Sequence, residues 1–342
     1  MNTLISVAWH SLLSRKKTVL LTFCSLVISI VVLLSVEHIR LQAKDSFNRT
    51  ISGVDLIVGA PSGQLNLLLY SVFRMGSPTN NIAFESYNMF KEHDLVKWAI
   101  PIALGDSHRS FRVMGTDEAY FEHFRYGNKQ PLTFNTGEPF EHLFETVIGA
   151  DVADTLQYKL GDKIVISHGM GATSFTHHDT SPFVIRGILA PTGTPVDKTV
   201  HIRLRALEAI HLSPNKLTAV IANHDLAPQP DNITSVMLGL TNKFATFTLQ
   251  RNINNYPDDR LMAILPGVAM AELWSLMSTV ENLLRVIALL VLISSLFGLA
   301  TMLLASMNER RGEIAVLRVL GAGPMVILIL ILLEALLLVA LS

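Results

Sequence analysis

Three long stretches of the chain are apolar and almost free of charge, and they constrain the fold more than any other feature. Thr18 to Val36 and Val286 to Met307 contain no charged residue, and Met325 to Leu341 is interrupted only by Glu334. A helix needs about 20 apolar residues to cross the hydrocarbon core of a bilayer. The first stretch is too long for a cleaved signal peptide, and no small-residue cleavage site follows it. We predict three transmembrane helices, over residues 18–36, 283–307 and 325–342.

The basic residues beside these stretches predict the topology. Arg15, Lys16 and Lys17 precede the first stretch, and Arg310, Arg311 and Arg318 follow the second. Both groups belong in the cytoplasm by the positive-inside rule. Residues 1–17 then form a cytoplasmic amphipathic segment, and residues 37–282 lie outside the membrane, which in a bacterium means the periplasm.

The composition agrees with a membrane protein that carries a folded external region. The chain has 27 basic and 28 acidic residues, so no basic surplus points to nucleic acid. The one cysteine, Cys24, lies in the first apolar stretch, which leaves the external region without disulfides. A region of this size can fold around its own hydrophobic core.

The external region mixes helical and strand patterns. Apolar residues at helical spacing continue the first apolar stretch and precede the second: Val36, Ile39, Ala43, Phe47 and Ile51, then Leu273, Leu276, Val280 and Leu284. Such faces indicate either two stalk helices that pack together or two ordinary amphipathic helices at the base of the domain.

Runs of β-forming residues between these helices predict strands. The predicted strands are Val54–Val58, Phe111–Met114, Lys163–Ser167, Phe183–Leu189 and Leu217–Ala222, with Thr241–Leu249 as a further candidate. An apolar patch over residues 65–73 is either a contact surface or part of the core. The predicted fold class is therefore membrane α-helical plus an α+β extracytoplasmic domain.

The segment Asn308 to Gly321, NERRGEIAVLRVLG, separates the last two apolar stretches. Glu309, Arg310 and Glu313 share one helical face, and Ile314, Leu317 and Leu320 recur on another. Gly321 follows as a stop signal. We predict a short amphipathic helix at the cytoplasmic surface that docks another protein; the alternative is a solvated loop that only sets topology.

Glu334 lies about ten residues into the third stretch, roughly 15 Å deep at the helical rise. A carboxylate at that depth is costly and marks either a functional group or a neutral glutamate held by a neighbouring helix.

Histidines are the only hint of a metal site. His168, His177 and His178 lie in a stretch rich in Gly, Ser and Thr, and histidine is a common zinc ligand. Their spacing matches no compact site and no cysteine joins them, so an exposed hairpin is the favoured interpretation. The sequence contains no HExxH helix and no nucleophile elbow, and we expect no catalytic residues.

Three segments resemble the MacB/FtsX permease family of ABC transporters. Residues 309–322, ERRGEIAVLRVLGA, are similar to the family's cytoplasmic pattern RRxEIavLRalGA, and Glu334 in ILLEA matches a glutamate usual in the next helix. VIGA at 147–150, LGD at 160–162 and IRGIL at 185–189 are similar to the pattern of the MacB-like periplasmic core domain. The resemblance runs essentially from end to end.

The resemblance implies a multi-pass permease of the bacterial inner membrane that works as a dimer with a separate cytoplasmic ABC ATPase, which would hold ATP and Mg. Residues 37–282 would be the periplasmic core domain with its stalk, 308–324 the coupling segment, and 283–342 an FtsX-like domain. That family has four spans, so the chain is expected to stop before the fourth. The ATPase contacts would come from Glu309, Arg310, Arg311, Glu313, Ile314, Leu317 and Arg318.

In such systems ATP-driven motion of the coupling helices passes through the stalks to the periplasm, where it acts on a lipoprotein, peptide or drug-like compound, with a possible periplasmic partner protein. The chain has no GxxxxGK[ST] loop, so we expect the ATPase to be another chain. The alternative is a membrane-anchored periplasmic binding or sensing protein linked to zinc.

Overall fold

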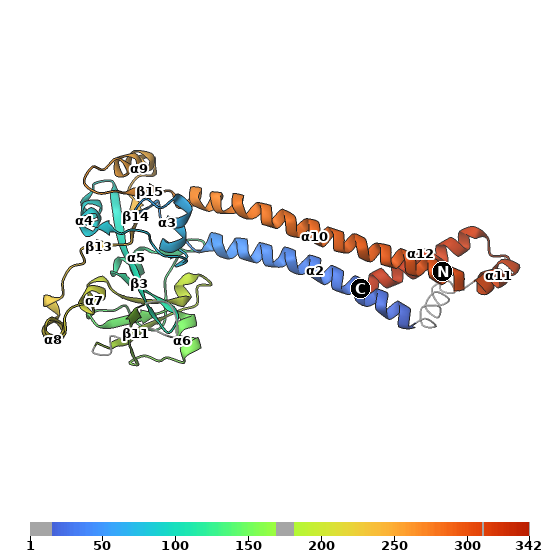
Figure 1. Cartoon of the computed structure of the whole chain (residues 1–342), viewed down its shortest axis with the longest axis horizontal. Coiled ribbons are helices and arrows are strands. Elements are labelled where there is room, and N and C mark those ends of the chain that lie inside the picture. The colour runs from blue at the N-terminus through green and yellow to red at the C-terminus, as the bar shows by residue number, and fades with distance from the viewer. Residues whose placement is uncertain (1–15, 169–180, 310, 342) are drawn as a thin grey trace. The chain divides into compact units, whose positions relative to one another are not determined.

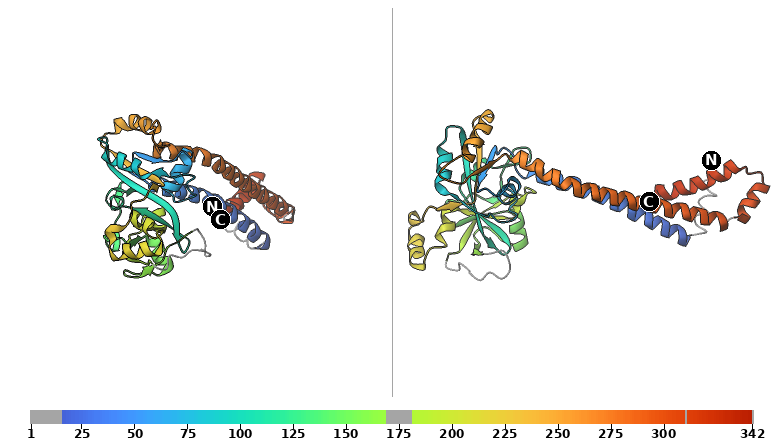
Figure 2. Two further views of the ribbon diagram at one scale, coloured as in Figure 1. Left: turned by 60° about the vertical axis from the view of Figure 1, so that its left-hand side comes forward. Right: turned by 45° about the horizontal axis from the view of Figure 1, so that its top comes forward.

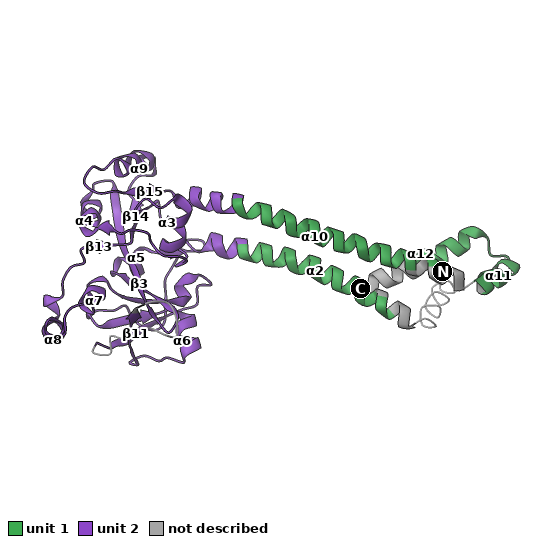
Figure 3. Ribbon diagram, in the orientation of Figure 1, with its two compact units in different colours: residues 1–43, 276–342 green, residues 44–275 purple. Residues whose placement is uncertain are grey.

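A computed structural model describes residues 16–168, 181–309 and 311–341. It divides into two compact units, shown in Figure 3: a helical unit of residues 1–43 and 276–342, and a sheet unit of residues 44–275. The sheet unit lies within the region that the sequence assigns to the outside of the membrane.

Figure 1 labels the α-helices and some of the strands. The helices are α2 Lys16–Arg49, α3 Gln64–Ser71, α4 Phe84–Glu92, α5 Ala119–His123, α6 Ala150–Leu156, α7 Leu204–Ala209, α8 Pro214–Ala222, α9 Thr246–Asn254, α10 Pro266–Glu309, α11 Arg311–Val319 and α12 Pro324–Leu341. Short 3₁₀ turns are η1 Pro195–Lys198, η2 His224–Leu226 and η3 Lys243–Ala245. The strands are β1 Leu56–Gly59, β2 Ile82–Ala83, β3 Val96–His108, β4 Phe111–Thr116, β5 Arg125–Tyr126, β6 Gln130–Pro131, β7 Phe134–Gly137, β8 Glu145–Ile148, β9 Lys163–Ile164, β10 Ser167–His168, β11 Phe183–Leu189, β12 Thr199–Arg203, β13 Asn232–Ile233, β14 Ser235–Leu240 and β15 Met262–Ile264.

Two described helices are long and apolar enough to cross a membrane. Their candidate spans are Phe23–Arg49 in α2 and Pro266–Thr301 in α10, and α12 contributes a shorter apolar stretch over Pro324–Leu333. The total of three spans stays a prediction. The helical extensions are confirmed, because α2 continues to Arg49 and α10 begins at Pro266.

The extensions pack as a pair, as the stalk alternative requires. Within the helical unit, α2 and α10 lie side by side in Figures 1 and 2, and Arg40 of α2 contacts Glu281 of α10. Within the sheet unit, the Trp274 indole donates a 3.0 Å hydrogen bond to Asn48 and packs edge-on against Phe47.

The sheet unit is built on one large mixed sheet. Among the described strands the order is β15-β1-β14-β3-β4-β12-β8-β11-β7, with β9 and β10 pairing at its sides. Most neighbours are antiparallel, but β4 pairs with β12 and β8 with β11 in parallel. The long strand β3 belongs to both parts of the sheet, since it pairs with β14 along its first half and with β4 along its second.

Both faces of the sheet are covered. Leu56 and Val58 of β1 belong to one buried cluster and Ile57 between them to a second, which is the alternation expected of a strand. Helices α4, α6, α7, α8 and α9 supply residues to the first cluster, and α3 and α5 supply residues to the second. The apolar patch over 65–73 forms α3 and belongs to the core, since Leu67, Leu68 and Tyr70 are fully buried.

The strand predictions have mixed outcomes. Phe183–Leu189 is confirmed as β11, and Phe111–Met114 lies within β4. Val54–Val58 is shifted to β1, and Lys163–Ser167 divides between β9 and β10.

Two predicted strands are wrong. Leu217–Ala222 lies in helix α8, and Thr241–Leu249 forms η3 and the start of α9. Each helix buries only one side: Leu217 and Val220 in α8, and Leu249 and Ile253 in α9. A spacing of three or four residues between buried positions fits a helix. Burial at this spacing outweighs the strand preference of the β-branched residues in these segments.

Candidate functional site

The charged segment after α10 forms the short helix α11, as predicted. It ends at Val319, and Gly321 follows with φ +92°, a left-handed conformation that suits glycine after a helix. Val316, Val319 and Leu320 are 60%, 87% and 78% exposed. Large apolar side chains that are this exposed on a short charged helix form a surface suited to a protein partner.

Of the seven residues predicted to contact an ATPase, five belong to α11, namely Arg311, Glu313, Ile314, Leu317 and Arg318, and Glu309 is the last residue of α10. Arg311 and Arg318 are exposed, and Ile314 is half-buried. The side chains of Glu309, Glu313 and Leu317 and the whole of Arg310 lie outside the described residues. What the structure adds is the backbone: α11 places positions 314 and 317 one helical turn apart.

Polar contacts join α2 and α10 within the helical unit. The hydroxyls of Ser29 and Ser295 hydrogen-bond to each other in a buried position, among apolar side chains. Further along, Arg40 pairs with Glu37 of its own helix and, at 3.2 Å, with Glu281 of α10. These contacts fix which residues of the two helices lie opposite each other, since a slide of either helix breaks them.

Glu334 lies in α12, and its side chain is outside the described residues, as are His177 and His178. His168 lies in β10, where its backbone pairs with Asp106 of β3, and its side chain is also outside them. Within the described ranges no group of three or more His, Cys, Asp or Glu side chains is placed to hold a metal ion. The metal hypothesis for these histidines stays a prediction.

Two other histidines are buried in the sheet unit and have structural roles. His108 contacts the Val165 carbonyl through Nδ1 at 2.6 Å and the Tyr158 hydroxyl through Nε2 at 2.9 Å. His201 is fully buried in β12, and burial, helped by the nearby Arg74, lowers its pKa to about 3. Both rings are therefore neutral at physiological pH.

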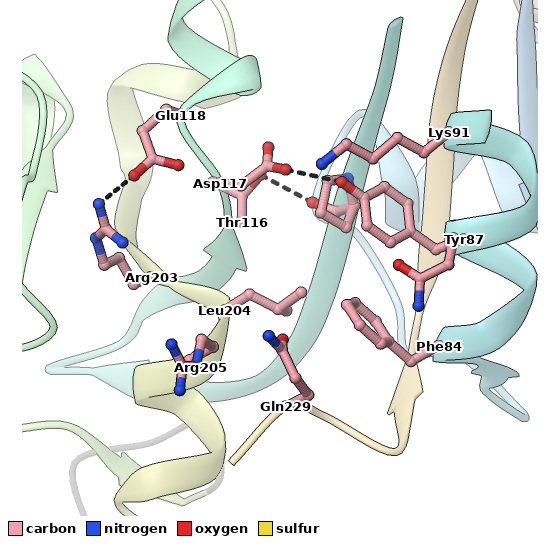
Figure 4. Close-up of a pocket in the computed structure, with 12 residues that line it drawn as sticks. Phe84, Tyr87, Lys91, Thr116, Asp117, Glu118, Arg203, Leu204, Arg205 and Gln229 are labelled. Carbon is pink, nitrogen blue, oxygen red and sulfur yellow. Dashed lines mark hydrogen bonds and ion pairs between the residues drawn. The ribbon is translucent and has the colours of Figure 1, made fainter. Parts of the chain in front are cut away.

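A cavity of about 360 Å³ opens in the sheet unit where β4 and β12 end, at a place that no sequence pattern indicated. Figure 4 shows it between α4 on one side and the start of α7 on the other. The residues that line it are Phe84, Tyr87, Asn88 and Lys91 of α4, Pro101 of β3, Thr116 at the end of β4, Asp117 and Glu118 after it, Arg203 to Arg205, and Gln229. We call it the strand-end pocket.

Burial raises the pKa of two groups in the strand-end pocket, Tyr87 and Asp117. One carboxylate oxygen of Asp117 accepts a 2.9 Å hydrogen bond from the Tyr87 hydroxyl. Burial raises the pKa of Asp117 to about 6, although the bond from Tyr87 acts the other way. Beside it, Glu118 forms an ion pair with Arg203, drawn in Figure 4.

We expect Asp117→Asn to stabilise the protein at pH 7.5 but not near pH 4. The pKa of Asp117 in the folded protein lies above its pKa in the unfolded chain, so folding favours the protonated carboxyl. The contribution of Asp117 to the stability is therefore complete below about pH 4 and is lost as pH rises through about 6. The gain at pH 7.5 should be about 1–2 kcal/mol, allowing for partial solvent screening. Thermal unfolding of the full chain in detergent at both pH values measures it.

The exposed Asp154 of α6 offers a matched control for that experiment. Asp154→Asn should change stability by less than about 0.5 kcal/mol at either pH. A destabilisation by Asp117→Asn of equal size at both pH values would contradict the role assigned to burial.

Neither the strand-end pocket nor Asp117 was predicted. The alternation of polar and apolar residues in Thr199–Arg203 was the one sequence signal that could have indicated β12. No sequence pattern indicates that β12 pairs in parallel with β4. The contacts that hold α2 against α10 were also missed, since isolated serines and charges in a long helix carry no specific signal.

Comparisons with known protein families match two parts of the chain. Residues 19–256 match the family model of the MacB-like periplasmic core domain, and residues 285–342 match that of the FtsX-like permease C-terminal domain. A curated relative, the lipoprotein-releasing system transmembrane protein LolE of Haemophilus influenzae, is 26% identical over 188 residues. The match covers 54% of this chain and 41% of that protein's length.

Two solved structures are also similar. The periplasmic region of MacB from Actinobacillus actinomycetemcomitans aligns with a TM-score of 0.39 and 11% identity, covering 68% of this chain and 95% of that one. The extracellular domain of the noncanonic ABC-type transporter YknZ from Gram-positive bacteria aligns with a TM-score of 0.36 and 13% identity, covering 62% and 99%.

Proposed function

The chain belongs to the MacB/FtsX-type family of ABC transporter permeases, and from that membership we propose that it passes ATP-driven conformational change from a cytoplasmic ATPase to the periplasm. Members of this family are typically transporter components and not themselves enzymes. The chain accordingly has a membrane-helical part and a periplasmic domain. The coupling mechanism and the cargo are the proposed part.

The observation that carries the proposal is the place of α11. This short helix lies between the apolar helices α10 and α12, inside the match to the FtsX-like domain. Its exposed arginines and exposed apolar residues offer both charge and apolar area to a partner, a combination found at protein interfaces. We assign the ATPase contact to residues 309–318, including Leu317 and Arg318.

The long helices supply a means of transmission. Helix α10 runs for 44 residues without interruption from Pro266 to Glu309, about 66 Å at the helical rise. Rigid helices carry a displacement over such a distance, and a bistable interface converts it into a change of state. The Ser29–Ser295 and Arg40–Glu281 contacts support joint movement of α2 and α10.

The partners follow from the family. A permease of this type needs an ABC ATPase and a second permease copy or homologue to form the transporter. We propose that ATP and Mg bind in the ATPase subunit and that the chain lies in a bacterial inner membrane as a multi-pass protein. Both interpretations of Glu334, a functional group or a neutral glutamate held by a neighbouring helix, stay predictions. For cargo we propose a lipoprotein, peptide or drug-like compound, the first supported by the similarity to LolE.

The proposal is tested by purifying the chain from a membrane fraction in mild detergent together with the ABC ATPase encoded beside it. We expect the ATPase to elute with the chain at a defined ratio and to hydrolyse ATP at a rate that the chain alters. If the ATPase never associates, the transporter function is wrong and a membrane-anchored sensing role replaces it.

A further inference from the structure

Helix α9 and the turn η3 before it present an exposed aromatic surface. The backbone stays in the right-handed helical region across the junction of the two elements, so they form one helical segment. Phe244 and Phe247 are 93% and 70% exposed. With the exposed Thr248 and Arg251 they follow the spacing i, i+3, i+4, i+7 of a single helical face. We call these four residues the aromatic face.

The opposite side of α9 fixes the helix to the sheet unit. Leu249 and Ile253 are buried there. The Gln250 amide donates a 2.9 Å hydrogen bond to the Ala263 carbonyl of β15, and the Ala263 N–H donates a 2.7 Å hydrogen bond to the Asn254 side chain. Figure 1 shows α9 on the outside of the sheet unit. The two phenyl rings are therefore held outward on a helix that is itself well anchored.

The charge at the aromatic face is positive. Between Asp231 and Asp258 the chain has two charged residues, Lys243 and Arg251, and both are basic. Both side chains are exposed, and neither forms an ion pair with any residue that the structure describes. Such a face attracts an anionic surface and repels a second copy of itself, because like charges would meet.

The apolar area of the face is small for a protein interface. A phenylalanine side chain has on the order of 200 Å² of surface, so the two rings together expose roughly 300 Å². A specific protein complex buries about 800 Å² on each partner. From residue 227 to residue 267, a stretch described in full, no other large apolar side chain is comparably exposed. A lipid surface demands no fixed contact area, since each ring that enters it leaves water.

The composition of the face also favours lipid. Aromatic rings beside lysine and arginine are typical of segments that lie in the interface between a bilayer and water. The chain has a membrane-helical part, so phospholipid belongs to its surroundings in the cell. An anionic bilayer surface supplies both phosphates for the cations and an apolar layer for the rings.

We propose that the aromatic face binds an anionic phospholipid surface, with Phe244 and Phe247 inserted among the lipids and Lys243 and Arg251 at the phosphates. The face belongs wholly to the sheet unit. Binding there requires neither the ATPase nor α11, so it goes beyond the coupling proposed above, and each proposal can fail without the other.

The test places the full chain in nanodiscs of neutral phosphatidylcholine and measures how these nanodiscs float with added vesicles. The vesicles contain phosphatidylcholine alone or with about 30% phosphatidylglycerol as the anionic lipid. In about 0.1 M salt, the nanodiscs should bind the anionic vesicles at least about tenfold more strongly than the neutral ones, because each cation near an anionic surface contributes several-fold. Nanodiscs without the chain should bind neither.

Phe244→Ser combined with Phe247→Ser should weaken binding to the anionic vesicles at least about tenfold, because the two rings no longer enter the lipid. Ile221→Ser combined with Leu226→Ser is the matched control, since it removes two apolar residues of α8 and η2 that are 45% and 59% exposed. This control should bind as the wild type does. All four positions lie at the surface, so both variants should keep the elution and circular dichroism of the wild type.

Three outcomes overturn the proposal. The first is that wild-type nanodiscs bind neither kind of vesicle, which leaves the face to a protein partner. The second is equal binding to neutral and anionic vesicles, which removes the role of the cations. The third is equal binding of the two double variants, which removes the assignment to α9. Nanodiscs that pair without vesicles, and do so only with both phenylalanines present, would instead make a second copy of the chain the occupant.

Discussion

Replacing Leu317 by Asp should remove the ATPase from the purified chain. A centrally placed apolar anchor of an interface typically contributes about 2 kcal/mol or more, roughly a 30-fold change in affinity, and a charge at that place adds the cost of its desolvation. We expect Arg318 beside it to supply the charged part of the same contact. We expect the amount of ATPase recovered with the Leu317→Asp chain to fall at least about tenfold.

Leu226→Asp provides the matched control, because it is the same substitution at an exposed residue of the sheet unit. Leu226 lies in η2 and is 59% exposed. An Asp there should leave the ATPase bound. If the two variants lose the ATPase equally, the loss does not come from α11, and the residue assignment is wrong.

A folding defect must be distinguished from a docking defect in this experiment. The sheet unit is formed by residues 44–275 and includes no residue of α11. The Leu317→Asp chain should therefore elute in detergent as the wild type does and keep its near-ultraviolet circular dichroism. Loss of that signal would show that the substitution acts on the fold.

Gly149→Ala should strongly destabilise the sheet unit, although it adds a single methyl group. A Cβ atom on Gly149 would lie 2.3 Å from the carbonyl oxygens of Val196 and Asp197. These are backbone atoms of η1, so no side-chain rotation relieves the clash. Overpacking of this kind costs about 3 kcal/mol, which corresponds to a fall in Tm of roughly 6–12 °C for a domain of this size.

Gly105 of β3 is the control for Gly149. A Cβ atom at Gly105 meets nothing within 4 Å, and the residue is exposed. Gly105→Ala should shift stability by less than about 1 kcal/mol in either direction. Thermal unfolding of both full-length variants makes the comparison; equal stability of the two would mean that η1 moves aside freely and that Gly149 is not required by packing.

The motif glycines illustrate how far a sequence pattern reaches. Gly149 and Gly187 both occur in segments that resemble the core-domain pattern of the family, but the pattern does not say why glycine is there. The structure gives the reason: a Cβ atom on Gly187 would lie 2.5 Å from the Glu138 carbonyl oxygen, and one on Gly149 would meet η1. At each position the absence of a side chain lets a strand or turn that is distant in sequence pack directly against the backbone.

The two wrong strand predictions have a related cause. Leu217–Ala222 and Thr241–Leu249 contain residues that fit strands, and local preference alone favours that state. Helix α8 begins with Pro214 after Ser213, a helix-start pattern that was available in the sequence and outweighed by the β-branched residues. In both segments the buried residues recur every three or four positions, and burial is a property of the folded domain.

The sequence by itself determined the apolar helices, their helical extensions, the charged helix α11 and the mixed character of the external domain. These features depend on the composition and periodicity of one segment, because the apolar residues of that segment leave water for the domain core or for lipid. Only the tertiary structure decided the strand-end pocket. Lys91, Asp117, Leu204 and Gln229 come from four distant segments, and they meet because β4 and β12 pair in parallel beside α4. Pairing of that kind depends on the packing of the whole sheet, which no local pattern encodes.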